Sequence, residues 1–294
     1  MAGMAYYLGI RELGAALVRT GPGFPAMQWE TIMKLQSTSL VTVPSFLLNL
    51  IDYALANGID LKKNPVEKAI CIGEGIRDGK FDLNPLGEQI SAQWPIKLYN
   101  TYASTEMQTA FTECSHGKGG HLQPDLVILE VLDDHGKAVS EGEYGEVTIT
   151  TLGIEGMPLI RYRTGDICAW YQSKCECGRW SKRLSPVLGR KQQMIKLKGT
   201  TLYPSAIFDL LQETAFVKEY VVEVFSNALG TDEVRVHLHT EEQDCEEELS
   251  GLFRGRLRVN PQFRQHSLKD IQEMQFPNGS RKKVRFLDKR PGLD

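Results

Sequence analysis

Two separated segments contain side chains suited to holding a nucleotide ribose. Residues 160–166 read Ile-Arg-Tyr-Arg-Thr-Gly-Asp and end in the carboxylate of Asp166, and further along the chain Arg190 directly follows a glycine. A carboxylate in a tight glycine turn can accept hydrogen bonds from both ribose hydroxyls, each contributing roughly 1.5–3 kcal/mol. The planar guanidinium of Arg190 suits ribose or phosphate oxygens. The alternatives are a turn aspartate that hydrogen-bonds its own backbone and an ordinary surface arginine.

A third segment, Tyr102-Ala-Ser-Thr-Glu, offers an aromatic ring, two hydroxyls and a carboxylate in close succession. Its ordinary structural interpretation is the start of a helix, with Ser104 or Thr105 as the N-cap and Glu106 in the first turn. That interpretation is compatible with a binding role, because anions bind at helix N-termini.

Sulfur and imidazole ligands form a further group. Cys175-Glu-Cys177-Gly resembles half of a zinc knuckle, and Cys114 together with His116 or His121 could complete a Cys₃His set. Such a closed tetrahedral site is structural, since it leaves no ligand position for water. The alternative is a set of reduced thiols without a metal. A catalytic thiol is disfavoured, because no separate base and orienting partner is evident.

The bulk composition is that of an ordinary globular protein. The chain has 294 residues, 41% of them hydrophobic and 24% charged, with a net charge of −3. Its length suits one large or two moderate domains. The charge gives no case for nucleic acid, and the chain contains neither a membrane-spanning apolar run nor a signal-peptide pattern. Six unevenly spaced cysteines are too few for a disulfide scaffold, so we expect a reducing, cytoplasmic location.

Strand and helix signals alternate in the first part of the chain. We expect helices at 4–20 and 46–57, and strands at 39–44 and 68–73. This alternation predicts an α/β layer with a mostly parallel sheet. Ligands of such sheets bind beyond the carboxyl ends of the strands, so residues 44–45, 73–74 and 102–106 are expected at one edge.

The sequence pattern changes after residue 125. Residues 126–151 alternate in polarity, which predicts an antiparallel hairpin or a small barrel. After Gly189 we expect strands at 194–197, 219–225, 233–240 and 284–287, and helices at 204–213 and 245–257. That element order is ferredoxin-like, an α+β arrangement. We therefore predict a main domain at 1–190 and a smaller C-terminal domain at 191–294.

The Tyr-x-Ser-Thr-Glu segment, the Tyr-Arg-Thr-Gly-Asp segment, the Gly-Arg pair and the Ile-Lys-x-x-Gly strand together resemble the adenylate-forming superfamily. This superfamily includes acyl-CoA synthetases, nonribosomal adenylation domains and luciferases, and the nearest branch resembles the phenylacetate–CoA ligases. The resemblance implies a partial AMP-binding α/β domain at 1–190 and a mobile lid at 191–294. It also implies that Asp166 binds the ribose and that Arg190 contacts the nucleotide.

The same resemblance implies roles for the upstream segments. Glu106 would help to hold Mg²⁺ on the ATP phosphates, in keeping with the preference of this hard cation for oxygen ligands. Tyr102, Ser104 and Thr105 would lie near adenine and the α-phosphate. The Gly73-Glu74-Gly75 segment resembles the adenine turn of the family, although Glu74 could also be a plain turn residue.

The resemblance places the lid pivot two residues after the Gly-Arg pair. Gln192 stands there in place of the usual aspartate, a change that keeps a polar side chain and drops the charge. Lys196 and Gly199 would lie on the coenzyme A side of the lid. Aligning residues 285–290 with the family's Arg-Val-x-Asp-x-Arg tail makes Lys282 the lysine that bridges carboxylate and α-phosphate, with Lys283 as the alternative. A basic run of this kind is otherwise a solvated face.

For the metal group, the resemblance favours zinc. Phenylacetate–CoA ligases often carry Cys-x-Cys-Gly together with an earlier Cys and a Gly-x-His segment. This pattern selects His121, which follows two glycines, over His116, and gives the zinc ligands Cys114, His121, Cys175 and Cys177.

One expected part of the family pattern is not found. A Ser/Thr/Gly-rich loop ending in Gly-Lys normally cradles the β- and γ-phosphates well upstream of the Tyr-x-Ser-Thr-Glu segment. The resemblance therefore covers nearly all of this chain but only about two-thirds of the family's usual length. The chain is expected to be a fragment, a partner of a separate N-terminal polypeptide, or a degenerate relative. A homodimer is a further possibility that the sequence leaves open.

The reaction that the resemblance implies is ATP-dependent activation of an aromatic or other carboxylic acid, followed by transfer to coenzyme A. The implied cofactors and small-molecule partners are ATP or AMP, Mg²⁺, coenzyme A, a carboxylic acid and structural Zn²⁺. The alternatives are a non-catalytic nucleotide- or acyl-adenylate-binding module and a zinc-stabilised subunit that completes an N-terminal partner.

Overall fold

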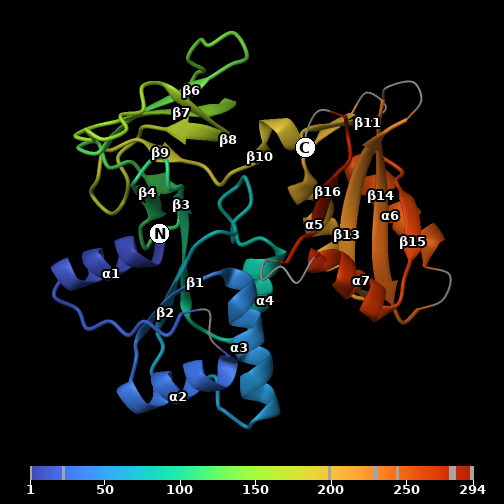
Figure 1. Ribbon diagram of the computed structural model, residues 1–294, viewed down its shortest axis with the longest axis horizontal. Helices are drawn as coiled ribbons and strands as arrows, with labels where there is room; N and C mark the ends of the chain where they lie inside the picture. Colours follow the sequence, from blue (N-terminus) through green and yellow to red (C-terminus); the bar gives the residue numbers. More distant parts are fainter. Residues whose placement is uncertain are drawn as a thin grey trace. The chain divides into compact units, whose positions relative to one another are not determined.

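The computed structural model describes residues 2–21, 24–197, 200–227, 231–242, 245–277 and 283–291 (Figure 1). The chain divides into two units. The first comprises Met1–Thr164 and Cys168–Val187, and the second comprises Gly165–Ile167 and Leu188–Asp294. Each unit has its own hydrophobic core, and the α/β class predicted from the sequence is confirmed. No helix in these described ranges is long and apolar enough to cross a membrane.

Helices and parallel strands alternate at the start of the first unit. In order they are α1 (Ala2–Glu12), α2 (Pro25–Leu35), β1 (Ser39–Thr42), α3 (Pro44–Ala56), β2 (Lys68–Cys71), α4 (Pro85–Gln93) and β3 (Lys97–Ala103). The strands β1, β2 and β3 pair in parallel. Trp29, Leu47, Ile51, Ile90 and Trp94 pack between the helices and these strands, with 0–2% of each exposed.

Proline at the first helical position sets the start of several helices. Pro25, Pro44 and Pro85 occupy this position in α2, α3 and α4, where the missing N–H removes no intrahelical bond. The predicted helix at 4–20 is wrong in its extent, since α1 ends at Glu12. Gly14 takes a left-handed φ of +78°, a conformation typical of residues that terminate helices.

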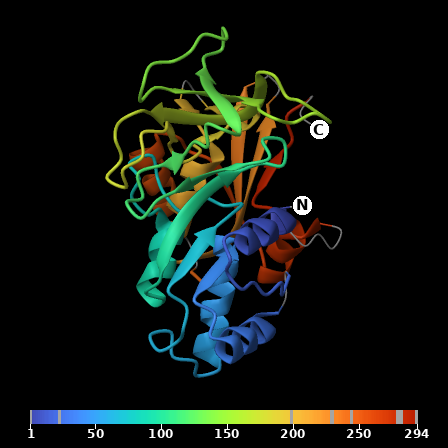
Figure 2. The same cartoon turned by 90° about the vertical axis from the view of Figure 1, so that its left-hand side faces the viewer.

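The sheet of the first unit continues from its parallel strands into antiparallel ones. The further strands are β4 (Ala110–Glu113), β5 (Gly120–His121), β6 (Val127–Leu132), β7 (Tyr144–Thr151), β8 (Tyr162–Tyr171), β9 (Arg183–Leu184) and β10 (Gly189–Arg190). Strand β3 pairs with β2 through residues 97–100 and with β4 through residues 101–103. Figure 2 shows this long strand passing from the helix-covered part to the antiparallel part.

The predicted hairpin at 126–151 is confirmed as the antiparallel pair β6/β7. The barrel-like alternative is wrong. The described strands follow an open path from β1 to β6, with β10 added beside β8. A barrel would need its first and last strands to pair, and here β1 and β6 are the two edges of the path.

The second unit contains the remaining elements. They are the 3₁₀ turn η1 (Lys191–Gln193), β11 (Ile195–Leu197), β12 (Thr200–Leu202), α5 (Pro204–Glu213), β13 (Val217–Ser226), β14 (Asp232–Thr240), α6 (Glu246–Leu257), β15 (Gln262–Gln265), α7 (Leu268–Gln275) and β16 (Phe286–Asp288). The main sheet has the order β15-β14-β13-β16, with an antiparallel centre and parallel outer pairs.

The α+β character of this unit was predicted, but its element order differs from the expected ferredoxin-like order. Strand β11 pairs with β12 in a separate two-stranded sheet, and the prediction missed β12, β15 and α7. Short segments such as 262–265 bury few side chains, so their alternation is weak and the sequence pattern passes over them.

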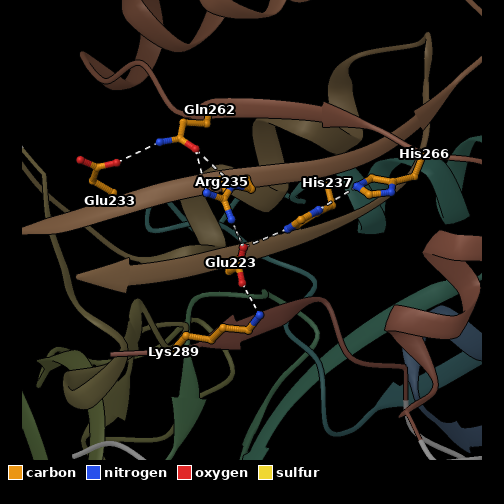
Figure 3. A network of polar contacts seen from close by, with 7 residues as sticks. All are labelled: Glu223, Glu233, Arg235, His237, Gln262, His266 and Lys289. Carbon is orange, nitrogen blue, oxygen red and sulfur yellow. Dashed lines mark hydrogen bonds and ion pairs between the residues drawn. The ribbon is translucent and has the colours of Figure 1, made fainter. Parts of the chain in front are cut away.

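A buried carboxylate organises one face of this sheet (Figure 3). Glu223 of β13, with 4% of its side chain exposed, contacts Arg235 Nη1 at 2.9 Å, His237 Nε2 at 3.0 Å and Lys289 Nζ at 2.5 Å. His237 Nδ1 lies 2.9 Å from His266 Nε2. Burial opposes ionisation of Glu223, but hydrogen bonds from Lys289 and His237 prevail and lower its pKa to about 2. The last strand is thereby tied to the sheet by charge as well as by its ladder.

Candidate functional site

Asp166 and Arg190 face each other across a pair of strands. They are directly opposed in the antiparallel β8/β10 register, and Arg190 Nε lies 3.5 Å from Asp166 Oδ1. The expectation that Asp166 sits in a tight turn is wrong: it lies inside β8, and it is Gly165 that takes a φ of +79°. Only 14% of the Asp166 side chain is exposed against 69% for Arg190. The pair therefore presents a partly buried carboxylate beside an accessible guanidinium.

Tyr203 and Ser205 hold the short strand that carries Arg190. A Cβ at Gly189 would lie 2.7 Å from Tyr203 Cγ, so the tyrosine ring packs directly on the glycine backbone. Ser205 Oγ donates a hydrogen bond of 2.8 Å to the Leu188 carbonyl. Both side chains flank the start of α5, so the helix start fixes the position of the strand. Glycine at 189 is required because any side chain would displace the tyrosine ring.

The loops after β1 and β2 meet at the carboxyl ends of those strands, as predicted. Glu74 Oε2 accepts a hydrogen bond of 2.9 Å from the Ser45 N–H, and Glu74 Oε1 accepts one of 3.0 Å from Ser45 Oγ. Ser45 lies in the first turn of α3, so Glu74 satisfies a helix N-terminal donor and complements the helix dipole. Gly73, with a φ of +78°, makes the turn that aims the carboxylate. A nucleotide role for Gly73 and Glu74 stays a prediction.

The Tyr102–Glu106 segment forms the end of β3 and the turn that follows it. Tyr102 Oη donates to Thr164 Oγ1 at 3.4 Å, and Ser104 Oγ accepts from the Met107 N–H at 3.3 Å. The helix interpretation is wrong, because residues 104–109 turn directly into the antiparallel strand β4. Thr105 and Glu106 are exposed at this turn. The carboxylate of Glu106 is thus open to a cation, although its magnesium role stays a prediction.

The residues predicted for the lid are only partly described. Lys282 and Gly199 lie outside the described residues. Gln192 lies in η1 and is exposed, and the exposed Lys196 donates its backbone N–H to Asp232 Oδ2 at 2.8 Å.

The alternative lysine has a clear partner in the structure. Lys283 Nζ lies 2.8 Å from Oε1 and 2.7 Å from Oε2 of Glu219, and Gln275 donates to the same carboxylate at 2.7 Å. An ammonium group engaged by both oxygens of one carboxylate is poorly placed to bridge a second pair of anions. This geometry argues against the alternative, Lys283, and the role of Lys282 stays a prediction.

Three thiols and one imidazole come together in the first unit. The ligand atoms of Cys114, His121, Cys175 and Cys177 all lie within 4.8 Å of one another. Cys114 Sγ is 3.6 Å from Cys175 Sγ, and Cys177 Sγ is 3.6 Å from His121 Nε2. Tetrahedral zinc, with bonds of roughly 2.3 Å to sulfur and 2.0–2.1 Å to nitrogen, separates its ligands by about 3.5–3.8 Å. These two separations match such an ion, and the other pairs of ligand atoms lie within 4.8 Å.

The surroundings favour the metal-binding protonation states of His121 and Cys177, whereas burial raises the pKa of the Cys114 thiol. His121 Nδ1 lies 3.3 Å from Ser181 Oγ, which leaves Nε2 directed at the thiols. Burial lowers the pKa of His121 and so favours the neutral, ligating imidazole. A hydrogen bond from the Arg179 backbone lowers the pKa of Cys177 to about 7, which favours the thiolate. His116 is outside the cluster, with its Nδ1 3.3 Å from Glu176 Oε2.

A buried ion pair, missed by sequence reasoning, joins the metal-ligand strand to the loop after Glu74. Arg77 Nε and Nη2 donate to the two oxygens of Glu113 at 2.6 and 2.9 Å, and 1% of the Glu113 side chain is exposed. Glu113 directly precedes Cys114, so this bidentate pair fixes the first thiol relative to the 73–77 turn. Arg77 and Glu113 are 36 residues apart in the sequence, so no local sequence pattern predicts that they form a pair.

Comparison with known proteins finds ligases among the proteins that this chain resembles. No protein-family model matches the chain. It is 28% identical over 209 residues to phenylacetate-coenzyme A ligase from Thermus thermophilus, covering 70% of this chain and 46% of that protein. It is 26% identical over 261 residues to phenylacetate-coenzyme A ligase from Pseudomonas putida, covering 87% and 57%. The chain thus spans about half the length of the curated relatives it matches.

Solved structures share the fold. A crystal structure of 2-hydroxyisobutyryl-CoA ligase in complex with R3-HIB-AMP has a TM-score of 0.73 at 21% identity, covering 91% of this chain and 58% of that one. Bacillus subtilis o-succinylbenzoate-CoA synthetase, in complex with the acyl-adenylate OSB-AMP, has a TM-score of 0.61 at 17% identity, covering 89% and 52%. The fold is that of the adenylate-forming ligases. In sequence the chain is similar to phenylacetate-coenzyme A ligases, the branch that its motifs resemble.

Proposed function

We propose that the chain belongs to an AMP-forming acid–CoA ligase of the phenylacetate–CoA ligase type. The observation that carries this proposal is the opposed pair Asp166 and Arg190, found in a chain whose curated relatives are named as acid–CoA ligases. The carboxylate would accept the ribose hydroxyls while the exposed guanidinium contacts the nucleotide oxygens. A non-catalytic binding module is not favoured by these relatives.

In the proposed reaction, a carboxylate oxygen attacks the α-phosphorus of ATP and pyrophosphate leaves. The thiolate of coenzyme A then attacks the acyl carbonyl and AMP leaves. The first step brings two anions together, so cationic groups supply most of its stabilisation. Glu106 would hold Mg²⁺ and Lys282 would bridge the carboxylate and α-phosphate. Tyr102, Ser104, Thr105 and Glu74 would line the nucleotide, while Lys196 and Gly199 would face coenzyme A.

The acid is proposed to be aromatic or otherwise hydrophobic, in line with the names of the relatives. The proposed domains, 1–190 and 191–294, would act as a nucleotide-binding body and a mobile lid that pivots at Gln192. Such closing motions commonly take microseconds to milliseconds and often limit turnover.

We propose that Cys114, His121, Cys175 and Cys177 hold a structural zinc ion. The ligand spacing and the Ser181 contact to His121 support this assignment. With all four protein ligands in place the ion would have no open position for chemistry, and its role would be to brace β4, β5 and the 175–178 turn. Because all six cysteines are free thiols and the three cysteines of this group must stay reduced to bind zinc, a cytoplasmic location is proposed.

The proposed function is tested by acid-dependent release of pyrophosphate from ATP. A panel of aryl and short-chain acids is offered with and without coenzyme A, and the products are identified as AMP, pyrophosphate and acyl-CoA. The proposal predicts pyrophosphate release that depends on the acid, and thioester only when coenzyme A is added. Formation of ADP and phosphate in place of these products, or failure of the chain to bind AMP at all, would overturn it.

A further inference from the structure

We propose that Arg290 is a positioning residue that locks the lid side of the linker and confines lid rotation to the backbone of Lys191 and Gln192. The proposal rests on the proposed function and assigns to Arg290 a role that neither the motifs nor the relatives supply. It is carried by the contacts of a nearly buried guanidinium, of which 11% is exposed.

All the donors of this guanidinium are engaged. Arg290 Nη2 donates to the Gln192 carbonyl and Nη1 to the Met194 carbonyl, both at 2.8 Å. Nη1 also contacts Asp232 Oδ2 at 3.2 Å, while Nε and Nη2 contact the carboxylate of Asp288 at 2.8 and 2.5 Å. Guanidinium has five N–H groups in a fixed fork, and these five contacts use it fully. Two linker carbonyls are thereby held to the last strand of the sheet.

Asp232 extends the clamp along the linker. The oxygen that accepts from Arg290 also accepts the Lys196 N–H at 2.8 Å, so β11 is tied to the same point at the start of β14. Everything from the Gln192 carbonyl to Lys196 is therefore part of one body with β14 and β16. Rotation cannot be absorbed beyond the Gln192 carbonyl without breaking these bonds.

On the upstream side, the chain is held as far as Arg190. The Leu188 N–H donates to the Ile167 carbonyl at 2.9 Å, and residues 189 and 190 pair with 167 and 166 of β8. Between this ladder and the Arg290 clamp lie only Lys191 and Gln192, at the start of η1. The Met194 N–H donates to the Lys191 carbonyl at 3.3 Å, so a rotation absorbed by these two residues would also break this long hydrogen bond.

The clamp also links the linker to the segment that bears the proposed reactive lysine. Lys283 is held by Glu219, residues 286–288 pair with 222–224 of β13, and Lys289 contacts Glu223 (Figure 3). Arg290 completes this series of anchors at the linker itself. A rotation at Lys191–Gln192 would therefore carry Lys283 and residues 286–290 with it as part of one rigid body.

The test compares Arg290→Gln and Arg290→Lys with the matched control Lys289→Gln. Lys289 is the adjacent residue in the tail and also forms an ion pair, but its side chain contacts Glu223 of β13 instead of the linker. Folding of each variant is checked by circular dichroism. Hydrogen exchange of the 192–197 backbone and tryptic cleavage after Lys191 are then measured. We expect both rates to rise at least about tenfold in the Arg290 variants, equivalent to about 1.4 kcal/mol, and to stay unchanged in Lys289→Gln.

If the 192–197 backbone exchanges hydrogen at the same rate in folded Arg290 and Lys289 variants, the proposal that Arg290 restrains the linker is overturned. A second readout separates positioning from simple stability: Arg290→Lys should lower kcat for thioester formation while leaving the Kd for AMP unchanged. If wild-type protein shows no acid-dependent turnover, the proposed function fails on its own, while the exchange measurement still decides whether Arg290 restrains the linker. An AMP Kd that weakens in step with kcat would contradict the positioning role.

Discussion

At the scale of single residues, the chemistry assigned to Asp166 makes a direct prediction. Asp166→Ala removes the carboxylate opposite Arg190 and should weaken AMP binding at least about tenfold, or about 1.4 kcal/mol. Calorimetric titration measures this change. The control is Glu130→Gln, which removes a half-buried carboxylate paired with Arg161 at 3.0 Å and should leave the affinity intact. Unchanged AMP affinity in Asp166→Ala would remove the ribose role.

The choice between two histidines can also be tested. His121→Asn should abolish binding of about one equivalent of zinc per chain, because its Nε2 faces the thiols. His116→Asn is the matched control and should keep the metal, since His116 pairs with the exposed Glu176 instead. Elemental analysis of the purified variants gives the answer. Zinc retained by His121→Asn and lost by His116→Asn would reverse the assignment.

Glu223 gives a prediction about pH. Its pKa is lowered in the folded state from the ordinary value of 4.5 to about 2, so its ionisation stabilises the fold above about pH 4.5, and this contribution is lost as the pH falls toward 2. Glu223→Gln should therefore lower the Tm markedly at neutral pH and progressively less in acid. Thermal melts across this range test the prediction. A Tm difference that is constant with pH would show that ionisation of Glu223 is not what stabilises the sheet.

Residues whose roles depend on local spacing were predictable, and those that depend on tertiary contacts were not. Cys175 and Cys177 are two residues apart and announce a ligand pair, and the cluster they form with Cys114 and His121 is found as expected. The roles of Ser181 and Arg290 depend instead on distant partners, for example a contact between Arg290 and Gln192. Sequence spacing carries no signal for such contacts.

At the scale of elements, the close approach of Tyr203 to strand β10 predicts an intolerance of side chains at Gly189. Gly189→Ala places a Cβ against the tyrosine ring, and overpacking of this kind costs about 1–3 kcal/mol. We expect a lower Tm and weaker AMP binding, because the strand that carries Arg190 shifts. Gly251→Ala in α6 is the control, since nothing lies within 4 Å of its added Cβ. If Gly189→Ala behaves like Gly251→Ala, the packing does not position Arg190.

Some helices and strands follow the sequence pattern and others do not. Strongly periodic segments such as 204–213, with proline at the first position, form the predicted helix. The helix expected at 4–20 stops early because a glycine with positive φ ends it, a local effect that hydrophobic spacing does not register. The 102–106 segment resembles a helix start in sequence. It forms a turn because β4 pairs antiparallel with β3, so the chain has to reverse direction between them.

At the scale of the whole molecule, we propose that the chain is part of an enzyme that joins an acid to coenzyme A through an acyl-adenylate. The structure contains the α/β and α+β units, the opposed Asp166 and Arg190, and the Cys/His cluster. Relatives 26–28% identical in sequence are named as ligases. The chain spans about half the length of those relatives. The complete reaction, from ATP binding to thioester release, is therefore a proposal that has to be tested by measurement.

Transfer of oxygen-18 from the acid tests this central claim most directly. A carboxylic acid labelled in both carboxyl oxygens is incubated with ATP, Mg²⁺ and coenzyme A, and the nucleotide products are analysed by mass spectrometry. Attack of a carboxylate oxygen on the α-phosphorus, followed by departure of AMP from the carbonyl, predicts AMP that carries a single label. Acyl-CoA formed alongside unlabelled AMP, or with the label in inorganic phosphate, would contradict the account.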